Sequence, residues 1–325
     1  MNIAEIAKRA GVSSATVSRY FNHGYISEGK KVAIRRVVEE TGYHPSVQAQ
    51  TLRTKKTKMI GVILPKIAST SMGSVVAGIL SGLEAEGYRL LLADTQSSPK
   101  KELEYLSVFD EKQVDGVILA ATVLTKKHKS VLKKMAIPIV IVGQRLEGYP
   151  HVFHDDYHAI YDMTRLVLRR GCQRLGYISA FHEDKAAGAA RFRGYSDAVR
   201  EAGLPELKDN YVIADFTIDS GYEKTKELLE RCGRLDAIIC ASDEMAAGAL
   251  RCARDMQIDV PGQMLVTGHG DSDLAKVISP MLPTVHYFYE ESGYAAAQMM
   301  LEILKKGQAG ENEIRMGYSI VNWAE

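Results

Sequence analysis

The chain has 325 residues, of which 46% are hydrophobic and 25% charged, with a formal net charge of +1. This length and composition are typical of a soluble globular protein with two or three domains. We find neither a signal peptide nor an apolar run near the roughly 20 residues of a membrane span, so we expect a cytoplasmic protein without membrane contact. The four cysteines lack metal-ligand spacing, which favours reduced thiols, and we expect no metal and no cofactor.

The charge is distributed unevenly along the chain. Residues 1–58 contain eleven Lys and Arg residues against four Glu residues, whereas the rest of the chain carries 30 basic and 36 acidic residues. A basic amino-terminal segment on a mildly acidic body is typical of a nucleic-acid-binding head attached to a soluble domain. The alternative is a solvated basic arm, but this segment also has the apolar pattern of a folded helical core.

Residues 3–22 have the pattern of two short helices around a tight turn. Gly11 interrupts the apolar periodicity where such a turn needs a residue without a Cβ, and Ser13 is a good N-cap for the second helix. Val17 and Phe21 stand one helical turn apart and are expected to pack inward. An ordinary helical hairpin would share this pattern, but a small, polar outer face with one arginine also suits a DNA major groove. The residues expected on that face are Ser14, Ala15, Ser18 and Arg19.

A third helix and a hinge are expected next. Ser27 can cap the third helix, Gly42 can end it, and Pro45 prevents its continuation. Residues 46–58 form either a plain linker or a short helix that is stable only when paired with its twin on DNA. In the second case the exposed Leu52 can insert into the minor groove while neighbouring basic side chains contact phosphates.

From Met59 onward, short apolar strands alternate with amphipathic helices, and the alternation restarts after residue 155. Near-continuous apolar strands separated by helices are typical of a parallel sheet covered on both faces. We therefore predict an α/β body of two doubly wound parallel-sheet subdomains. In such folds a ligand binds at the carboxyl ends of the strands, here in the cleft between the two halves.

Together these segments resemble the LacI/GalR family of bacterial transcriptional repressors. The head carries the resemblance through IAEIAKRAGVSSATVSRYFN, GYHPS and the AQTL run around Leu52, and the body adds VDGVIL, ARFRGY, SDEMAAGAL and TGHGD. The resemblance implies a homodimeric repressor with an all-α helix-turn-helix head and a periplasmic-binding-protein-like body. The implied organisation is a head at residues 1–45, a hinge at 46–58, and a ligand-binding and dimerisation domain at 59–325, with one subdomain at about 59–155 and 285–313 and the other at about 156–284 and 314–325.

The resemblance also implies which residues bind a palindromic operator in double-stranded DNA, and that the bound protein is nucleoid-associated. Ser14, Ala15 and Arg19 match positions that contact bases, and Arg19 is the best candidate for a bidentate guanine contact. Thr16 and Ser18 match positions that contact the DNA backbone. The full set expected at the DNA is Ser14, Ala15, Thr16, Ser18, Arg19, Asn22, Ser46, Ala49, Leu52, Arg53 and Lys55.

For the effector, Arg193 in ARFRGY matches the family arginine that binds ligand hydroxyls, and Phe216 matches an aromatic residue that covers a sugar ring. Ser242 is expected to reach the ligand from a strand end, whereas Asp243 is expected to be an N-cap. The full set expected to bind the effector is Ser69, Ser71, Met72, Gln144, Arg145, Arg193, Phe216, Ser242, His269 and Asp271.

Two departures from the family pattern bear on the effector. Gly270 stands where the first residue of an aspartate pair is common, and Gln144 follows Gly143 where Asp-Arg is common. The lost carboxylates and side-chain volume favour a roomier pocket and a di- or oligosaccharide, with Gln144 and His269 as replacement donors. Three histidines without carboxylate geometry are expected to be surface residues rather than metal ligands, namely His151, His154 and His158.

Other functions remain as alternatives at this stage. A solute-binding protein of the periplasmic type would share the body, but it would need an export signal and no basic head. An α/β enzyme is disfavoured because PKIASTS, and no P-loop or G-x-G-x-x-G, follows the first strand. A regulator of the same family with a purine co-repressor stays open, although we expect a sugar that releases the operator. No leucine heptad follows the last predicted strand, so we expect a dimer.

Overall fold

The computed structural model describes residues 1–22, 24–43, 56–111, 114–204 and 209–323. These residues form two compact units, Met1–Thr57 and Lys58–Glu325. Within the described part of the chain, no helix is both long and apolar enough to cross a membrane. Five of the residues predicted to contact DNA lie outside the described residues, namely Ser46, Ala49, Leu52, Arg53 and Lys55.

The first unit contains helices α1 (Ile3–Ala10), α2 (Ser14–Phe21) and α3 (Glu28–Thr41) around a small core. Ile6, Val17 and Ile34 are fully buried in this core, one from each helix. Gly11 ends α1 at a φ of 65°, in the left-handed region that favours glycine, and Ser13 caps α2 by accepting from the Thr16 N–H at 3.2 Å. The predicted turn and cap are therefore confirmed.

The first lobe of the second unit contains a six-stranded parallel sheet with its core on both faces. Its strands in spatial order are β11 (Glu313–Met316), β5 (His151–His154), β4 (Ile139–Val142), β3 (Gly116–Ala120), β1 (Met59–Leu64) and β2 (Arg89–Asp94). The pairing places Val62 of β1 opposite Ile118 of β3. The helices of this lobe are α5 (Thr70–Glu84), α6 (Pro99–Asp110), α7 (Lys126–Leu132) and α13 (Tyr289–Lys306).

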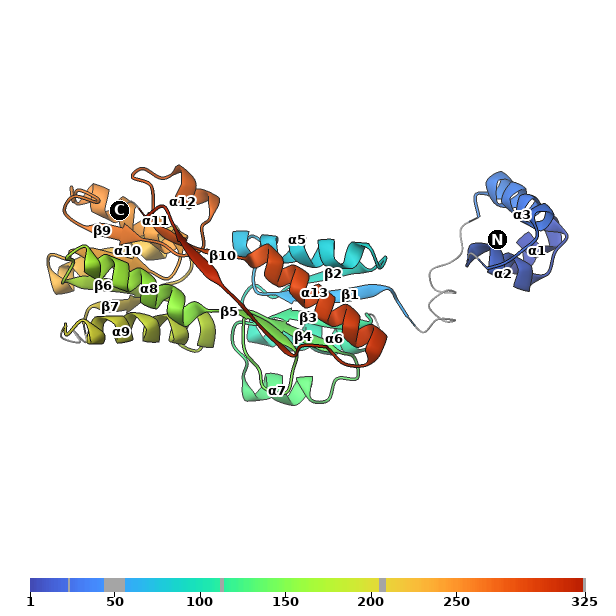
Figure 1. The fold of residues 1–325 in the computed structure, drawn as a ribbon, viewed down its shortest axis with the longest axis horizontal. Coiled ribbons are helices and arrows are strands. Elements are labelled where there is room, and N and C mark those ends of the chain that lie inside the picture. Colours follow the sequence, from blue (N-terminus) through green and yellow to red (C-terminus); the bar gives the residue numbers. More distant parts are fainter. Residues whose placement is uncertain (23, 44–55, 112–113, 205–208, 324–325) are drawn as a thin grey trace. The chain divides into compact units, whose positions relative to one another are not determined.

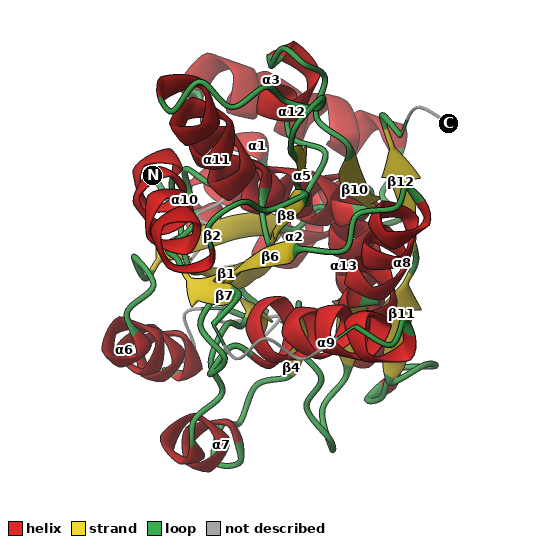
Figure 2. Ribbon diagram, turned by 90° about the vertical axis from the view of Figure 1, so that its left-hand side faces the viewer, coloured by secondary structure: helices red, strands yellow, loops and turns green. Residues whose placement is uncertain are grey.

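The second lobe contains a four-stranded parallel sheet with helices on both faces, as Figure 2 shows for α10 and α11 on one side and α8 and α9 on the other. Its strands in spatial order are β7 (Tyr211–Ile213), β6 (Leu175–Ser179), β8 (Ala237–Cys240) and β9 (Leu265–Thr267). Its helices are α8 (Asp156–Arg169), the π-helix η1 (Lys185–Ala190), α9 (Arg191–Glu201), α10 (Ile218–Cys232), α11 (Asp243–Asp255) and α12 (Asp273–Val277). The two predicted doubly wound halves are thus confirmed.

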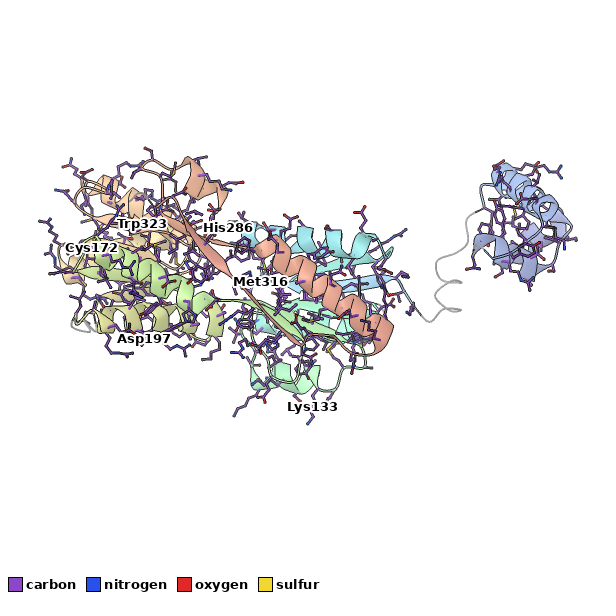
Figure 3. All side chains as sticks on the ribbon, in the orientation of Figure 1. Lys133, Cys172, Asp197, His286, Met316 and Trp323 are labelled. Atoms are coloured by element: carbon purple, nitrogen blue, oxygen red, sulfur yellow. The ribbon has the colours of Figure 1, made fainter. Side chains whose placement is uncertain are left out.

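Three connections join the lobes: β5 to α8, β10 (Thr284–Tyr287) to α13, and β11 to β12 (Tyr318–Val321). Figure 1 shows these segments running between the two lobes, and β10 pairs antiparallel with β12. In Figure 3 the side chains of Met316 and His286 lie near this junction, whereas Trp323 lies far into the second lobe. Because β11 pairs with β5 as far as Met316, the chain leaves the first lobe after that residue.

Strand β5 also corrects the prediction for the histidines. His151 and His154 lie on this strand and expose only 5% and 7% of their surface, whereas His158 on α8 has a half-exposed side chain. The strand was not predicted because it has only four residues and carries a histidine at each end. Two of the three expected surface histidines are therefore interior residues.

Candidate functional site

The outer face of α2 presents the residues predicted to contact bases. Ser14, Ala15 and Arg19 are exposed, whereas Val17 on the opposite face is fully buried against α1 and α3. Because Ser13 caps the helix, the first turn of α2 begins directly at Ser14. Among the residues that the structure describes, no carboxylate pairs with Arg19. Within the described residues, its guanidinium is therefore available to an external acceptor.

Three further predicted DNA contacts form hydrogen bonds within α2 and its caps, namely Thr16, Ser18 and Asn22. Thr16 Oγ1 lies 2.9 Å from Ser13 Oγ, so this hydroxyl belongs to the N-cap. The Asn22 Nδ2 group donates to the Ser18 carbonyl oxygen and lies 3.4 Å from Ser18 Oγ. These three side chains shape the two ends of the helix, and the free recognition surface is centred on Ser14, Ala15 and Arg19.

A second candidate site lies between the two lobes of the body. Gln144, in the loop after β4, donates through Nε2 to the Thr122 carbonyl at 3.0 Å and to Asp184 Oδ1 at 2.7 Å. Gln144 belongs to the first lobe and Asp184 to the second, and both side chains are about 95% buried. Burial raises the pKa of Asp184, and the hydrogen bond from Gln144 opposes that shift. Gln144 was expected to donate to the ligand, and in this structure it donates to Thr122 and, across the lobes, to Asp184.

Arg191, at the start of α9, is the arginine that points inward. Its Nε donates to Asp156 Oδ1 at 2.7 Å, and its Nη1 donates to the Ala241 carbonyl at 2.6 Å, just after β8. Arg193 is exposed instead, and its guanidinium lies 4.8 Å from the centre of the Tyr157 ring on the outer surface. The inward position expected for Arg193 is therefore held by Arg191.

The helical periodicity of α9 explains why Arg191 points inward and Arg193 does not. Gly194 packs so closely on α8 that a Cβ would lie 2.3 Å from the Tyr157 carbonyl oxygen. Arg191, three residues earlier, lies on the same inner face of the helix, whereas Arg193 does not. The R-x-x-G spacing was therefore the signal in the sequence that could have identified Arg191.

Around Arg191, buried polar residues form what we call the interlobe polar cluster: His154, Asp156, Arg191, His269 and Tyr287. The Tyr287 hydroxyl donates to Asp156 Oδ1 at 3.1 Å and lies 2.7 Å from His269 Nε2. Burial lowers the pKa of His154 and lowers that of His269 well below its ordinary value, which favours the neutral form of both imidazoles. His154 Nε2 and His269 Nδ1 are buried without a hydrogen-bond partner.

Several other predicted effector residues have partners within the protein. Arg145 pairs with Glu313 at 2.9 Å and lies over the Phe153 ring at the exposed edge of the first sheet, so it does not face the second lobe. Asp271 Oδ2 lies 2.8 Å from His286 Nδ1. Ser242 is the N-cap of α11, accepting from the Met245 N–H at 3.2 Å. For Arg145 the prediction is therefore corrected.

Asp243 was expected to cap α11, but it is the first residue inside that helix. Its carboxylate accepts from the Ser272 N–H at 2.7 Å and from Thr284 Oγ1 at 2.5 Å, and its side chain is almost fully buried. It therefore ties the loop after β9 to β10. Ser242 serves as the cap because the strand–helix turn comes one residue earlier than expected.

The remaining predicted effector residues are partly exposed. Ser69 Oγ lies 2.9 Å from Ser71 Oγ at the start of α5, and Met72 packs against the core of the first lobe. Phe216 follows β7 with 38% of its surface exposed. Two cavities of about 290 and 330 Å³ lie at the opposite, amino-terminal edge of the second sheet, and none of the predicted effector residues lines them.

Two family models match parts of this chain, and several regulators match nearly all of it. Residues 2–46 match the model of the lacI family of bacterial regulatory proteins, and residues 164–322 match that of the periplasmic binding protein-like domain. The transcriptional regulator RegA of Clostridium saccharobutylicum is 29% identical over 98% of this chain and 97% of its own. The repressor PurR of Pectobacterium carotovorum is 30% identical over 92% and 89%. The sucrose operon repressor of Staphylococcus xylosus is 28% identical over 94% of each chain.

Solved structures of two regulators have the same fold as this chain. A complex of the regulator CelR with cellobiose has a TM-score of 0.76 and 25% identity, over 99% of this chain and 98% of its own. A lac repressor dimer bound to its operator and an anti-inducer has a TM-score of 0.90 with the same coverage. At 20% identity, the second comparison shows the common fold alone.

Proposed function

Because the chain belongs to the LacI family of bacterial regulatory proteins, we propose that it represses a carbohydrate-utilisation operon and is released from a palindromic operator by a sugar. The chain is a DNA-binding transcriptional regulator, and its relatives are regulators rather than enzymes. The observation that carries the proposal is the exposed face of α2, on which Arg19 stands without a carboxylate partner among the described residues.

At the operator, each α2 enters the major groove of one half-site. Arg19 donates two hydrogen bonds to one guanine, which discriminates against the wrong base by roughly 1–3 kcal/mol. Ser14 and Ala15 are small enough to let the helix approach the base edges closely. Contacts to the DNA backbone come from Thr16, Ser18 and Asn22, and the hinge contacts assigned from the sequence to Ser46, Ala49, Leu52, Arg53 and Lys55 remain part of the proposal.

The effector binds between the lobes, beside the interlobe polar cluster. Arg191 replaces Arg193 as the proposed arginine for sugar hydroxyls, because its donors lie in the interior. Both Nε2 hydrogens of Gln144 have partners in the protein, so Gln144 accepts from the sugar through Oε1. His269 supplies a further hydrogen bond, and Phe216 covers a ring. Two relatives have disaccharides in their names, cellobiose and sucrose, which supports a di- or oligosaccharide here. Ser69, Ser71, Met72, Ser242 and Asp271 complete the proposed set.

The DNA-binding part of the proposal is tested by selection from a random double-stranded library with the full-length protein. We expect enriched sequences with two inverted half-sites, because two copies of α2 bind together. Arg19→Gln should lower affinity for the selected site about tenfold or more and relax the preference at one base pair in each half-site. As a control, Arg36→Gln removes one positive charge from α3, and it should lower the affinity for all DNA sequences by the same factor. Enrichment without inverted symmetry would contradict the proposal.

A further inference from the structure

The hydrogen bond between Gln144 and Asp184 is a buried, direct contact between the two lobes. Gln144 Nε2 is also held by the Thr122 carbonyl, so the amide is fixed in the first lobe at the end of β4. Its partner Asp184 uses the same oxygen, Oδ1, to accept from the N–H groups of Ala186 and Ala187 at 2.9 Å each. One carboxylate oxygen therefore joins the first lobe to the first turn of η1.

The helix η1 has a form that is unusual and sensitive to its cap. A π-helix is rare in proteins and is found mostly at functional sites. This one is held by the Asp184 side chain at its start, and Gly188 permits its closest approach, since a Cβ there would lie 2.0 Å from the Phe181 carbonyl oxygen. A change at Asp184 therefore acts directly on the geometry of η1.

The last residue of η1, Ala190, is followed directly by Arg191. Arg191 binds Asp156 at the β5–α8 connection, and Asp156 accepts from Tyr287 at the end of β10, beside the β10–α13 connection. A path of hydrogen bonds, buried at Gln144–Asp184 and at Arg191–Asp156–Tyr287 and joined by the backbone of η1, therefore links Gln144 to two of the three connections between the lobes. Buried polar networks of this kind specify one arrangement when every member has a partner.

We propose that the Gln144–Asp184 hydrogen bond is an interlobe latch that holds the lobes closed and transmits their closure through η1 and Arg191 to the connecting segments. This inference rests on the proposed function only in that it assigns the latch to the effector site. A ligand between the lobes shifts the equilibrium between the latched and unlatched arrangements only if it binds one of them more tightly than the other. Asp184 is a positioning residue in this proposal, whereas Gln144 both holds Asp184 and belongs to the proposed effector site.

The latch is tested by hydrogen–deuterium exchange on the full-length protein without DNA or sugar. Gln144→Leu should speed exchange of the Ala186 and Ala187 amides and of peptides covering 154–157 and 284–290. One lost hydrogen bond corresponds to roughly a threefold to tenfold change in an opening equilibrium. Small-angle scattering should show a larger radius of gyration as the lobes separate. The matched control is Arg145→Leu, the neighbouring residue whose ion pair with Glu313 lies within the first lobe; it should change neither reading.

A second variant covers the case in which Gln144→Leu does not fold. Gln144→Glu keeps the shape of the side chain but places a second carboxylate against Asp184, and it should speed exchange in the same peptides at least as much. In an Asp184→Ala background, Gln144→Leu should add no further change, because the shared contact is already lost. Exchange that rises only near residue 144, or that rises equally in both backgrounds, would overturn the latch. Since no operator or sugar enters these measurements, their failure is distinguishable from failure of the proposed function.

Discussion

At the scale of single residues, two arginines two positions apart have opposite roles. Arg191 is buried with Asp156, whereas Arg193 is exposed over Tyr157. Arg191→Met should lower the free energy of unfolding by about 3–5 kcal/mol, because it leaves the Asp156 carboxylate buried without its partner. Arg193→Met should cost about 1 kcal/mol or less. Urea denaturation of both variants measures this contrast, and equal losses would contradict the assignment of Arg191 to the interior.

A second prediction at this scale concerns pH. Glu102 on α6 lies 3.3 Å from His128 on α7, and both side chains are almost fully buried. Burial raises the pKa of Glu102 from 4.5 to about 7 and lowers the pKa of His128. A carboxyl group whose pKa is raised on folding stabilises the protein fully below its ordinary pKa, and this contribution is lost as the pH rises toward 7.

Glu102→Gln should therefore gain stability relative to the natural protein as the pH is raised from about 4.5 to 7. The depressed pKa of His128 acts with the opposite sign, and it is present in both proteins. The relevant quantity is thus the difference between the two unfolding free energies, measured by urea denaturation across that range. A difference that does not vary with pH would show that Glu102 titrates normally.

At the scale of elements, α5 and α13 approach each other through glycine. A Cβ on Gly78 of α5 would lie 1.8 Å from the Glu290 carbonyl oxygen, whereas a Cβ on Gly73 of the same helix would meet nothing within 4 Å. Gly78→Ala should therefore cost about 3 kcal/mol, because two backbones must separate. Gly73→Ala should be neutral or stabilise by up to about 1 kcal/mol. Thermal unfolding distinguishes them, and similar midpoints would contradict the described packing.

Some limits of helices and strands could be predicted from the sequence, and others could not. Gly11, Ser13 and Gly42 fixed the limits of the head helices because their conformational demands are local. The alternation of apolar strands with helices from Met59 onward was also predicted, because continuous apolar runs such as 60–64 and 237–240 can be recognised locally. Strand β5 was not predicted, because it has only four residues and its outer partner β11 lies far away in the sequence. The π-helix η1 was not predicted, because this form of helix is rare.

The interlobe residues were the hardest to predict. Ser242, Gln144 and His269 were assigned to strand ends, and the structure places all three there as buried residues. Asp184 was missed because nothing local distinguishes a carboxylate that pairs with a side chain 40 residues away. Arg145 was misassigned because its partner Glu313 arrives only when the chain returns to the first sheet.

At the scale of the whole molecule, we propose that a second copy of the chain binds the first lobe at α5 and the edge strand β2. Residues 70–83 of α5 include no charged side chain, although Leu80 is 49% exposed, and the edge strand β2 exposes 41% of Leu92. A surface helix ordinarily carries charges on its outer face. This surface therefore supports the proposed homodimer, which would bring two heads to one palindrome.

Leu80→Asp should convert the proposed dimer into a monomer, because it places a charge in a desolvated contact. Sedimentation of the full-length protein measures the change in mass. Val108→Asp on α6 is the matched control: Val108 is 41% exposed on another helix, and this variant should leave the dimer intact. A variant at Leu80 that sediments as the natural protein does would remove α5 from the interface.

We propose that a sugar bound between the lobes lowers the affinity of the head for DNA. This proposal is tested most directly by fluorescence anisotropy with an operator chosen by selection, at fixed salt, with cellobiose, sucrose and adenine added separately. We expect at least one saccharide to weaken operator binding by roughly 5- to 150-fold, the usual range of coupling between two sites, with adenine giving no change. Tighter binding with adenine, or an affinity that no saccharide alters, would contradict the account.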